Sequence, residues 1–201
     1  MDIARVAAGL FVKHGLRATR AEDIAQAAGI APRTFYRYFA TKEEAVAPLY
    51  AAGAQRWAEA VREAPADLSV QQALEHAARH TLTPGVGVSA ASWEWVRTLI
   101  RLAEADPGLG KVWAEVCQAG ERTLADVLAE RLTPSDDNVA DSPHVSPHLR
   151  FAAAVASAAV RTAVEAWATG DAPAAGSEGP TGLALRHLGA LGEFPWEGRR
   201  A

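Results

Sequence analysis

The most constraining feature of the chain is residues 21–39, which have the pattern of two short helices joined by a tight bend. Gly29 can adopt the left-handed backbone conformation that closes a helix. Pro32 suits the first turn of the next helix, where its missing N–H is not needed. Within that second helix, Phe35 and Phe39 stand one turn apart and indicate a buried side. Together these residues predict a helix–turn–helix.

The other side of the second helix is basic and polar. It carries Arg33, Thr34, Tyr36 and Arg37. A helix–turn–helix that exposes guanidinium and hydroxyl groups is suited to the major groove of DNA. Arg33 and Arg37 are the candidates for reading bases, because one guanidinium can bond O6 and N7 of a guanine together.

Around this motif, residues 3–50 resemble the DNA-binding domain of the TetR family of bacterial transcriptional regulators. The residues that carry the resemblance are Leu10, Phe11, Gly15, Thr19, Asp23, Ile24, Ala25, Ala28, Gly29, Ile30, Thr34, Phe35, Tyr36, Tyr38, Phe39, Thr41, Lys42 and Glu43. The resemblance implies an all-α protein with two domains. Residues 1–48 would form an N-terminal three-helix helix–turn–helix DNA-binding domain, and residues 49–201 a C-terminal helical ligand-binding and dimerisation domain.

The resemblance also implies which residues contact DNA. We expect Thr34, Tyr36 and Tyr38 to meet phosphates, and Lys42 to lie over the DNA backbone at the start of the following helix. The predicted DNA-binding residues are Thr19, Arg20, Pro32, Arg33, Thr34, Tyr36, Arg37, Tyr38 and Lys42. One departure from the family is Ala31, which stands where a capping serine is frequent. The alternative interpretation is that these polar side chains only solvate an exposed helix.

The rest of the chain predicts helices and no strands. Thr19 with Glu22, and Thr41 with Glu44, have the spacing of capping boxes at the start of a helix. Apolar periodicity and helix breakers predict helices over residues 41–63, 69–82, 90–105, 109–132, 149–169 and 183–191, with a polar linker over residues 133–147. Pro48 would kink the first of these helices between the two domains.

The charge distribution agrees with a nucleic-acid partner for the N-terminal part. The whole chain has a formal net charge of -4, but residues 1–50 contain seven Lys and Arg against five Asp and Glu. Small imbalances of this kind are common by chance, so the charge supports the motif without deciding the function.

Other functional classes find little support in the sequence. Cys117 is the only cysteine, which excludes an intramolecular disulfide and a cysteine-cluster metal site. No phosphate-binding loop, nucleophile elbow or metalloprotease motif occurs, so we expect neither an enzyme nor a cofactor. The N-terminal residues are amphipathic rather than secretory, and no apolar run reaches membrane-spanning length. We therefore expect a cytoplasmic protein with no membrane partner.

Tryptophans in the central helices predict either a core or a pocket. Trp93, Trp95 and Trp113 belong to segments with apolar residues on two faces. In TetR-like proteins the same helices enclose an inducer, which here would be an unknown small hydrophobic molecule. The predicted ligand-binding residues are His76, His80, Trp93, Val96, Ile100, Trp113 and Cys117, with Glu94 and Arg97 as further polar groups. His76 and His80 also have a zinc-binding spacing, but no third ligand is adjacent in sequence.

Small side chains on one face of residues 149–169 predict close approach of another helix. The face consists of Ala152, Ala156, Ala159 and Ala163. With residues 183–191, it would form the four-helix interface through which TetR-like proteins form a homodimer. The resemblance thus implies a ligand-responsive regulator that binds a palindromic operator in double-stranded DNA, with repression released by an inducer. The alternative is a helical binding or interaction protein of the same fold without gene-regulatory activity.

Overall fold

The computed structural model describes residues 2–86, 90–133 and 145–197. Its helices are α1 (Asp2–His14), α2 (Ala21–Ala27), α3 (Pro32–Tyr38), the 3-10 helix η1 (Glu43–Val46), α4 (Ala47–Glu63), α5 (Val70–Leu82), α6 (Ala90–Ala105), α7 (Pro107–Leu132), α8 (Pro147–Thr169) and α9 (Pro180–Gly189). Within the described ranges these are the regular elements, which confirms the all-α prediction. No helix there has the length and apolar character that crossing a bilayer requires. Most of the expected linker, residues 134–144, lies outside the described residues.

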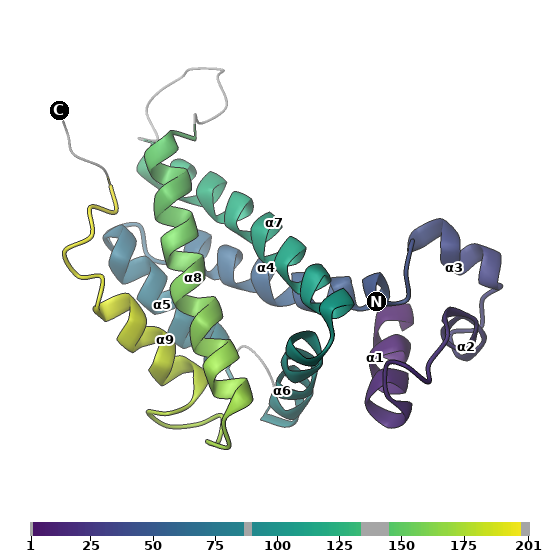
Figure 1. Ribbon diagram of the computed structural model, residues 1–201. Coiled ribbons are helices and arrows are strands. Elements are labelled where there is room, and N and C mark those ends of the chain that lie inside the picture. Colours follow the sequence, from purple (N-terminus) through teal and green to yellow (C-terminus); the bar gives the residue numbers. More distant parts are fainter. Residues whose placement is uncertain (1, 87–89, 134–144, 198–201) are drawn as a thin grey trace.

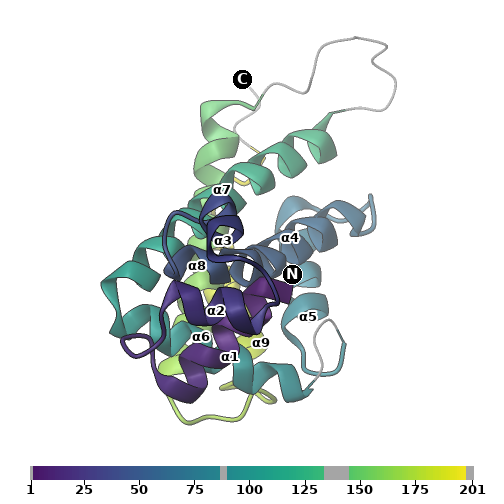
Figure 2. The same cartoon turned by 90° about the vertical axis from the view of Figure 1, so that its right-hand side faces the viewer.

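The helices form two groups, which we call the head (α1–α3) and the body (α4–α9) (Figure 1). The head lies at one end of the molecule, and α4 runs from it into the body. In the body, α7 packs against α4, α6 and α8, whereas α5 packs against α4 and α9. Figure 2 looks onto the head, with α1, α2 and α3 in front of the body. One side of α2 and α3 therefore faces away from the rest of the molecule.

The bend between α2 and α3 has the predicted helix-closing geometry. Gly29 has φ +70°, in the left-handed region. The Gly29 N–H donates to the Gln26 carbonyl at 3.1 Å, and the Ile30 N–H donates to the Ala25 carbonyl at 2.9 Å. These two bonds satisfy carbonyl groups that would otherwise be unpaired at the end of α2. Pro32 then lies in the first turn of α3, where a backbone N–H would have no helical partner.

The start of α2 differs from the prediction by one residue. Arg20, rather than Thr19, is the N-cap, and its N–H donates to the Asp23 carboxylate at 2.8 Å. Thr19 is only 2% exposed, and its hydroxyl donates to the Gly15 carbonyl at 2.9 Å. The Thr19 side chain therefore ties the loop to the end of α1, so the predicted capping box with Glu22 is wrong.

The connection between head and body is a 3-10 turn followed by an α-helix. The Thr41 hydroxyl accepts from the Glu44 N–H at 3.3 Å, and the Glu44 carboxylate accepts from the Ala40 N–H at 2.8 Å. η1 follows this cap, and Pro48 lies in the first turn of α4. Proline is accommodated there because the first-turn N–H groups have no helical partner. Pro48 thus marks the change from 3-10 to α geometry, and the expected kink within one continuous helix is wrong.

The alanine face of α8 is buried within the chain. Ala152, Ala156 and Ala163 have no exposed surface, and Ala159 is 8% exposed. α8 packs against α6, α7 and α9 of the same molecule. The small side chains do permit close helix packing, but their assignment to the dimer interface is wrong, because the helices that cover them belong to the same chain.

Candidate DNA-binding face and internal cavity

α3 presents the predicted polar face outward and its aromatic anchors inward. Phe35 is fully buried, and its ring centroid lies 5.2 Å from that of the partly buried Phe39. Tyr36 and Tyr38 are 51% and 61% exposed. The exposed residues of α3 that the sequence assigned to DNA are Pro32, Arg33, Tyr36, Arg37 and Tyr38, and Thr34 is half-buried beside them. The buried Phe35 ring, with Phe39 packed beside it, fixes the rotation of α3 about its axis, so the polar residues on the opposite side face solvent.

Arg33 is the free cation of this face. Within the described residues, its guanidinium has neither a hydrogen bond nor an ion pair, whereas Arg20, Tyr36 and Arg37 each have a partner. The Arg37 guanidinium donates to the Tyr38 hydroxyl at 3.2 Å and lies 5.0 Å from the centre of its ring. The Tyr36 hydroxyl donates to the Glu22 carboxylate at 3.3 Å. The same carboxylate, on α2, lies 3.6 Å from Nε of Arg20 at the N-cap of that helix, so α2 and α3 both contribute to one exposed polar surface.

Two predicted DNA-binding residues are engaged inside the head. Thr19 is buried, as described above, which removes its side chain from the exposed face. The Lys42 ammonium donates to the Leu16 carbonyl at 2.6 Å and to the Thr19 carbonyl at 2.9 Å. It also lies 4.0 Å from the Glu43 carboxylate, and its side chain is 24% exposed. Lys42 thus connects the start of η1 to the loop before α2. Sequence alone could not show this contact, because the bonded residues lie 26 and 23 positions apart.

The N-terminus of α3 lacks a side-chain cap. Ala31 is the N-cap, with φ -70° and ψ 146°, and it has no side-chain oxygen to accept from the first N–H groups. We expect Ala31→Ser to raise the free energy of unfolding by about 0.5–1 kcal/mol, because the serine hydroxyl can accept one of these N–H groups. Urea unfolding followed by circular dichroism would measure the change. Ala31→Val is the control without an oxygen, and a serine variant no more stable than this control would contradict the prediction.

The body contains a cavity of about 730 Å³. Its aromatic walls are Tyr50 and Trp57 from α4, Trp93 from α6 and Trp113 from α7. Of the residues predicted to bind a ligand, Trp93, Val96, Ile100, Trp113 and Cys117 line it. Their common location is a geometric finding, and their contact with a ligand remains a prediction. Trp95 is 47% exposed and lies where the cavity opens to solvent.

His76 and His80 do not line the cavity, which corrects their assignment to the ligand site. Both are exposed on α5, whose buried side is formed by apolar residues such as Leu74 and Ala77. Their spacing of four residues places both on the solvent side of the helix. In the described part of the chain, no group of three potential metal ligands forms around them or elsewhere.

Three residues that line the cavity were not among the predicted ligand-binding residues. Tyr50 and Trp57 lie two turns apart on α4, and Arg161 lies on α8. The spacing of Tyr50 and Trp57 was a usable signal, since it places two large aromatic residues on one helix face. Arg161 was also noticeable, because it interrupts an otherwise alanine-rich helix together with Ser157, one turn earlier.

Several polar side chains of the cavity wall have hydrogen-bond or ion-pair partners. The Trp113 indole donates to the Glu165 carboxylate at 2.7 Å, and Arg161 lies 3.1 Å from the same carboxylate group. The Tyr50 hydroxyl donates to the Leu99 carbonyl at 2.9 Å, and burial raises the pKa of this hydroxyl. Burial likewise raises the pKa of the Cys117 thiol to about 12, so the thiol stays protonated near neutral pH. A protonated thiol is a poor nucleophile. Cys117 therefore forms part of the apolar surface of the cavity.

A few polar wall atoms have no partner. The indole N–H groups of Trp57 and Trp93 and the Ser157 hydroxyl are buried without a hydrogen bond in the described residues. An unpaired buried donor costs about 1–3 kcal/mol. These three groups are therefore available to bond a polar group of a molecule in the cavity.

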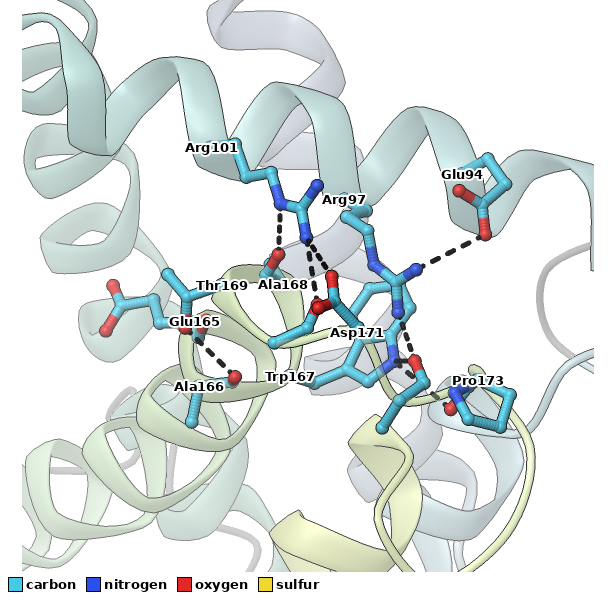
Figure 3. Close-up of polar contacts among 12 residues, drawn as sticks. Glu94, Arg97, Arg101, Glu165, Ala166, Trp167, Ala168, Thr169, Asp171 and Pro173 are labelled. Atoms are coloured by element: carbon cyan, nitrogen blue, oxygen red, sulfur yellow. Dashed lines mark hydrogen bonds and ion pairs between the residues drawn. The ribbon is translucent and has the colours of Figure 1, made fainter.

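Arg97 has a structural contact in place of the predicted ligand contact. Its guanidinium lies 4.3 Å from the centre of the Trp167 ring and donates to the Ala172 carbonyl (Figure 3). One turn later, Arg101 donates to the Ala168 carbonyl at 2.6 Å and to the Gly170 carbonyl at 2.9 Å. The two arginines therefore fasten α6 to the end of α8 and cap its free carbonyl groups. Glu94, also expected near a ligand, forms an ion pair with Arg97 at 3.6 Å.

Comparison with known proteins agrees with the helix–turn–helix and its position in the chain. The family model described as bacterial regulatory proteins, tetR family, matches residues 3–47. The HTH-type transcriptional regulator TcmR of Streptomyces glaucescens is 32% identical over 135 residues, which is 65% of this chain and 58% of that protein. Residues 3–47 thus match the N-terminal segment of TetR-family regulators. The HTH-type transcriptional repressor KstR2 of Mycobacterium tuberculosis is 47% identical to this chain over 45 residues, 22% of each protein.

A solved TetR-family structure shares the fold over almost the whole length. Thermus thermophilus FadR, a TetR-family transcriptional repressor in complex with lauroyl-CoA, has a TM-score of 0.54 and 20% identity to this chain. The match covers 100% of this chain and 96% of that structure. The similarity in fold therefore includes α4–α9, beyond the residues that the family model matches.

Proposed function

We propose that this protein is a ligand-responsive transcriptional repressor that binds DNA as a homodimer in the cytoplasm. The observation that carries the proposal is the outward face of α3, on which Arg33 is free and Arg37 is exposed. This face belongs to the segment that matches the TetR family. The name of KstR2, a repressor that shares 47% identity over this segment, supports repression as the direction of control.

We assign a separate function to each of the two groups of helices. Residues 1–48 would bind DNA, and residues 49–201 would bind the ligand and the second copy of the chain. In the head, Arg33 and Arg37 would read bases, whereas Tyr36 and Tyr38 would position the helix on phosphates. Pro32 and Thr34 flank them in the first turn of α3, and Arg20 would add a phosphate contact from the start of α2.

Selection of binding sites from random DNA, followed by titration of variants, tests this function. We expect Arg33→Ala to relax the preference at one base position, with a loss of about 1–3 kcal/mol there, because a bidentate contact to guanine is removed. Arg37→Ala should weaken binding to the selected site as well. The control is Arg150→Ala, since Arg150 is exposed on α8 in the body and has no partner in the described residues. Binding that is unchanged in both head variants would exclude α3 as the DNA-reading element.

The proposed dimer uses the outer side of α8 together with α9. The residues on this side are Phe151, Val155, Ala158 and Thr162, which recur every three or four positions and are exposed or half-buried. Phe151 is 58% exposed, which is unusual for a large apolar side chain. Two-fold association through this side would place two α3 helices on one DNA duplex, so the operator should be palindromic.

The proposed ligand is a mainly hydrophobic small molecule held in the cavity between α4, α5, α6, α7 and α8. A volume of about 730 Å³ falls in the range of small-molecule sites, and the aromatic walls provide rigid apolar surface. Repression would be released if the ligand binds more tightly to a head arrangement that does not fit DNA. The extent of release is set by this difference in affinity.

A further inference from the structure

The cavity of the body extends to the first helix of the head. Arg5 and Ala8 of α1 line it, beside Leu49 and Ala52 near the start of α4. Ala8 is buried, whereas Arg5 is exposed. The cavity therefore opens to solvent along a boundary between head and body, and a molecule in this opening would contact both.

Some of the charged side chains that line the cavity have ion-pair partners and others do not. Arg161 is neutralised by Glu165 at 3.1 Å on the same helix. Arg5 on α1 and Arg56 on α4 are both exposed, both line the cavity, and neither has a hydrogen bond or an ion pair within the described residues. Among the lining residues, Glu121 on α7 is an acidic side chain that likewise has no hydrogen bond or ion pair within the described residues. The lining thus has an excess of free positive charge around an apolar interior, which favours a negative group on a bound molecule.

We propose that the ligand is an amphiphilic organic anion. Its apolar body would lie against Tyr50, Trp57 and Trp113, and its carboxylate, phosphate or sulfonate group would be held at the opening by Arg5 and Arg56. This inference rests on the proposed function and specifies the ligand class for the same cavity. Because one arginine belongs to the head and the other to α4, an anion held by both joins head to body directly. Ligand binding would then restrain the position of α1.

Two fluorescent probes of matched shape test the inference. Anilinonaphthalene sulfonate is an aromatic anion, and N-phenylnaphthylamine is its uncharged analogue. We expect Arg5→Gln and Arg56→Gln each to weaken binding of the anion by about three- to fivefold, the effect of losing one partly exposed charge pair. Binding of the neutral probe should change less than twofold. Energy transfer from the cavity tryptophans would report binding inside the cavity, and Arg122→Gln, an unpaired exposed arginine on α7 outside the lining, is the control.

The outcomes separate this inference from the proposed function. The inference is supported if the arginine variants lose affinity for the anion alone and also need more anion to release DNA. It is overturned if both variants bind the anion as the wild type does, or if they lose affinity for both probes equally. In either of those cases the neutral probe still reports a functional cavity, and the proposed function stands. If neither probe binds the wild-type protein, the cavity's role in ligand binding is overturned together with this inference.

Discussion

Ala158→Arg is expected to produce a folded monomer, whereas Ala156→Arg is expected to prevent folding. The two alanines are two positions apart on α8 but face opposite environments. Ala156 has no exposed surface, so an arginine there would place an unpaired charge among packed helices, at a cost of at least about 4 kcal/mol. Ala158 is half-buried on the outer side of α8, near Val155 and Thr162, where an arginine can reach solvent in the single chain.

Sedimentation and circular dichroism together distinguish these effects. The Ala158→Arg protein should keep its helical signal, sediment as a monomer at micromolar concentration and lose most of its affinity for a palindromic site, because the two heads are no longer linked. Ala114→Arg, on an exposed position of α7, is the matched control and should leave the dimer intact. A dimer unaffected by Ala158→Arg, or a wild-type protein that sediments as a monomer, would refute the proposed interface.

This pair of alanines also shows where sequence reasoning reaches its limit. α8 is apolar on nearly all sides, so periodicity identifies a buried helix without indicating which neighbour covers which face. The helix boundaries, in contrast, were predictable from local chemistry. Ser69 accepts from the Gln72 N–H at 3.3 Å and α5 begins at Val70, close to the predicted position. Caps and breakers act within a few residues, which is why they can be read from the chain.

Some features of the candidate site were predictable from the sequence and others were not. The outward face of α3 follows from Phe35 and Gly29, because a buried ring and a fixed bend leave one orientation for the helix. For Trp93 and Trp113 the sequence left two alternatives, core or pocket, and both residues line the cavity. Arg97 could not be assigned, since its partners lie on the far end of α8 and in the following loop. Whether a polar side chain faces a ligand, solvent or a backbone carbonyl depends on contacts between distant segments.

Lys42→Met is expected to lower the free energy of unfolding by about 2–3 kcal/mol. The variant keeps the aliphatic stem but loses both charge-assisted hydrogen bonds, to the Leu16 and Thr19 carbonyls. Those carbonyls would be left partly shielded from water in the loop that precedes α2. The position of α2 relative to α1 depends on this loop, so weaker DNA binding should follow from the loss of order rather than from a lost phosphate contact.

Urea unfolding and the salt dependence of DNA binding decide between these two roles of Lys42. With a structural role, Lys42→Met is less stable and the slope of log affinity against log salt is unchanged. With a phosphate contact, stability is preserved and the slope falls by roughly one unit. Lys13→Met is the matched control, because Lys13 is exposed on α1 without a partner in the described residues, and its stability should change by less than about 0.5 kcal/mol. A stable Lys42→Met protein with a reduced salt slope would place the ammonium on the DNA backbone after all, and would require it to leave the Leu16 and Thr19 carbonyls on binding.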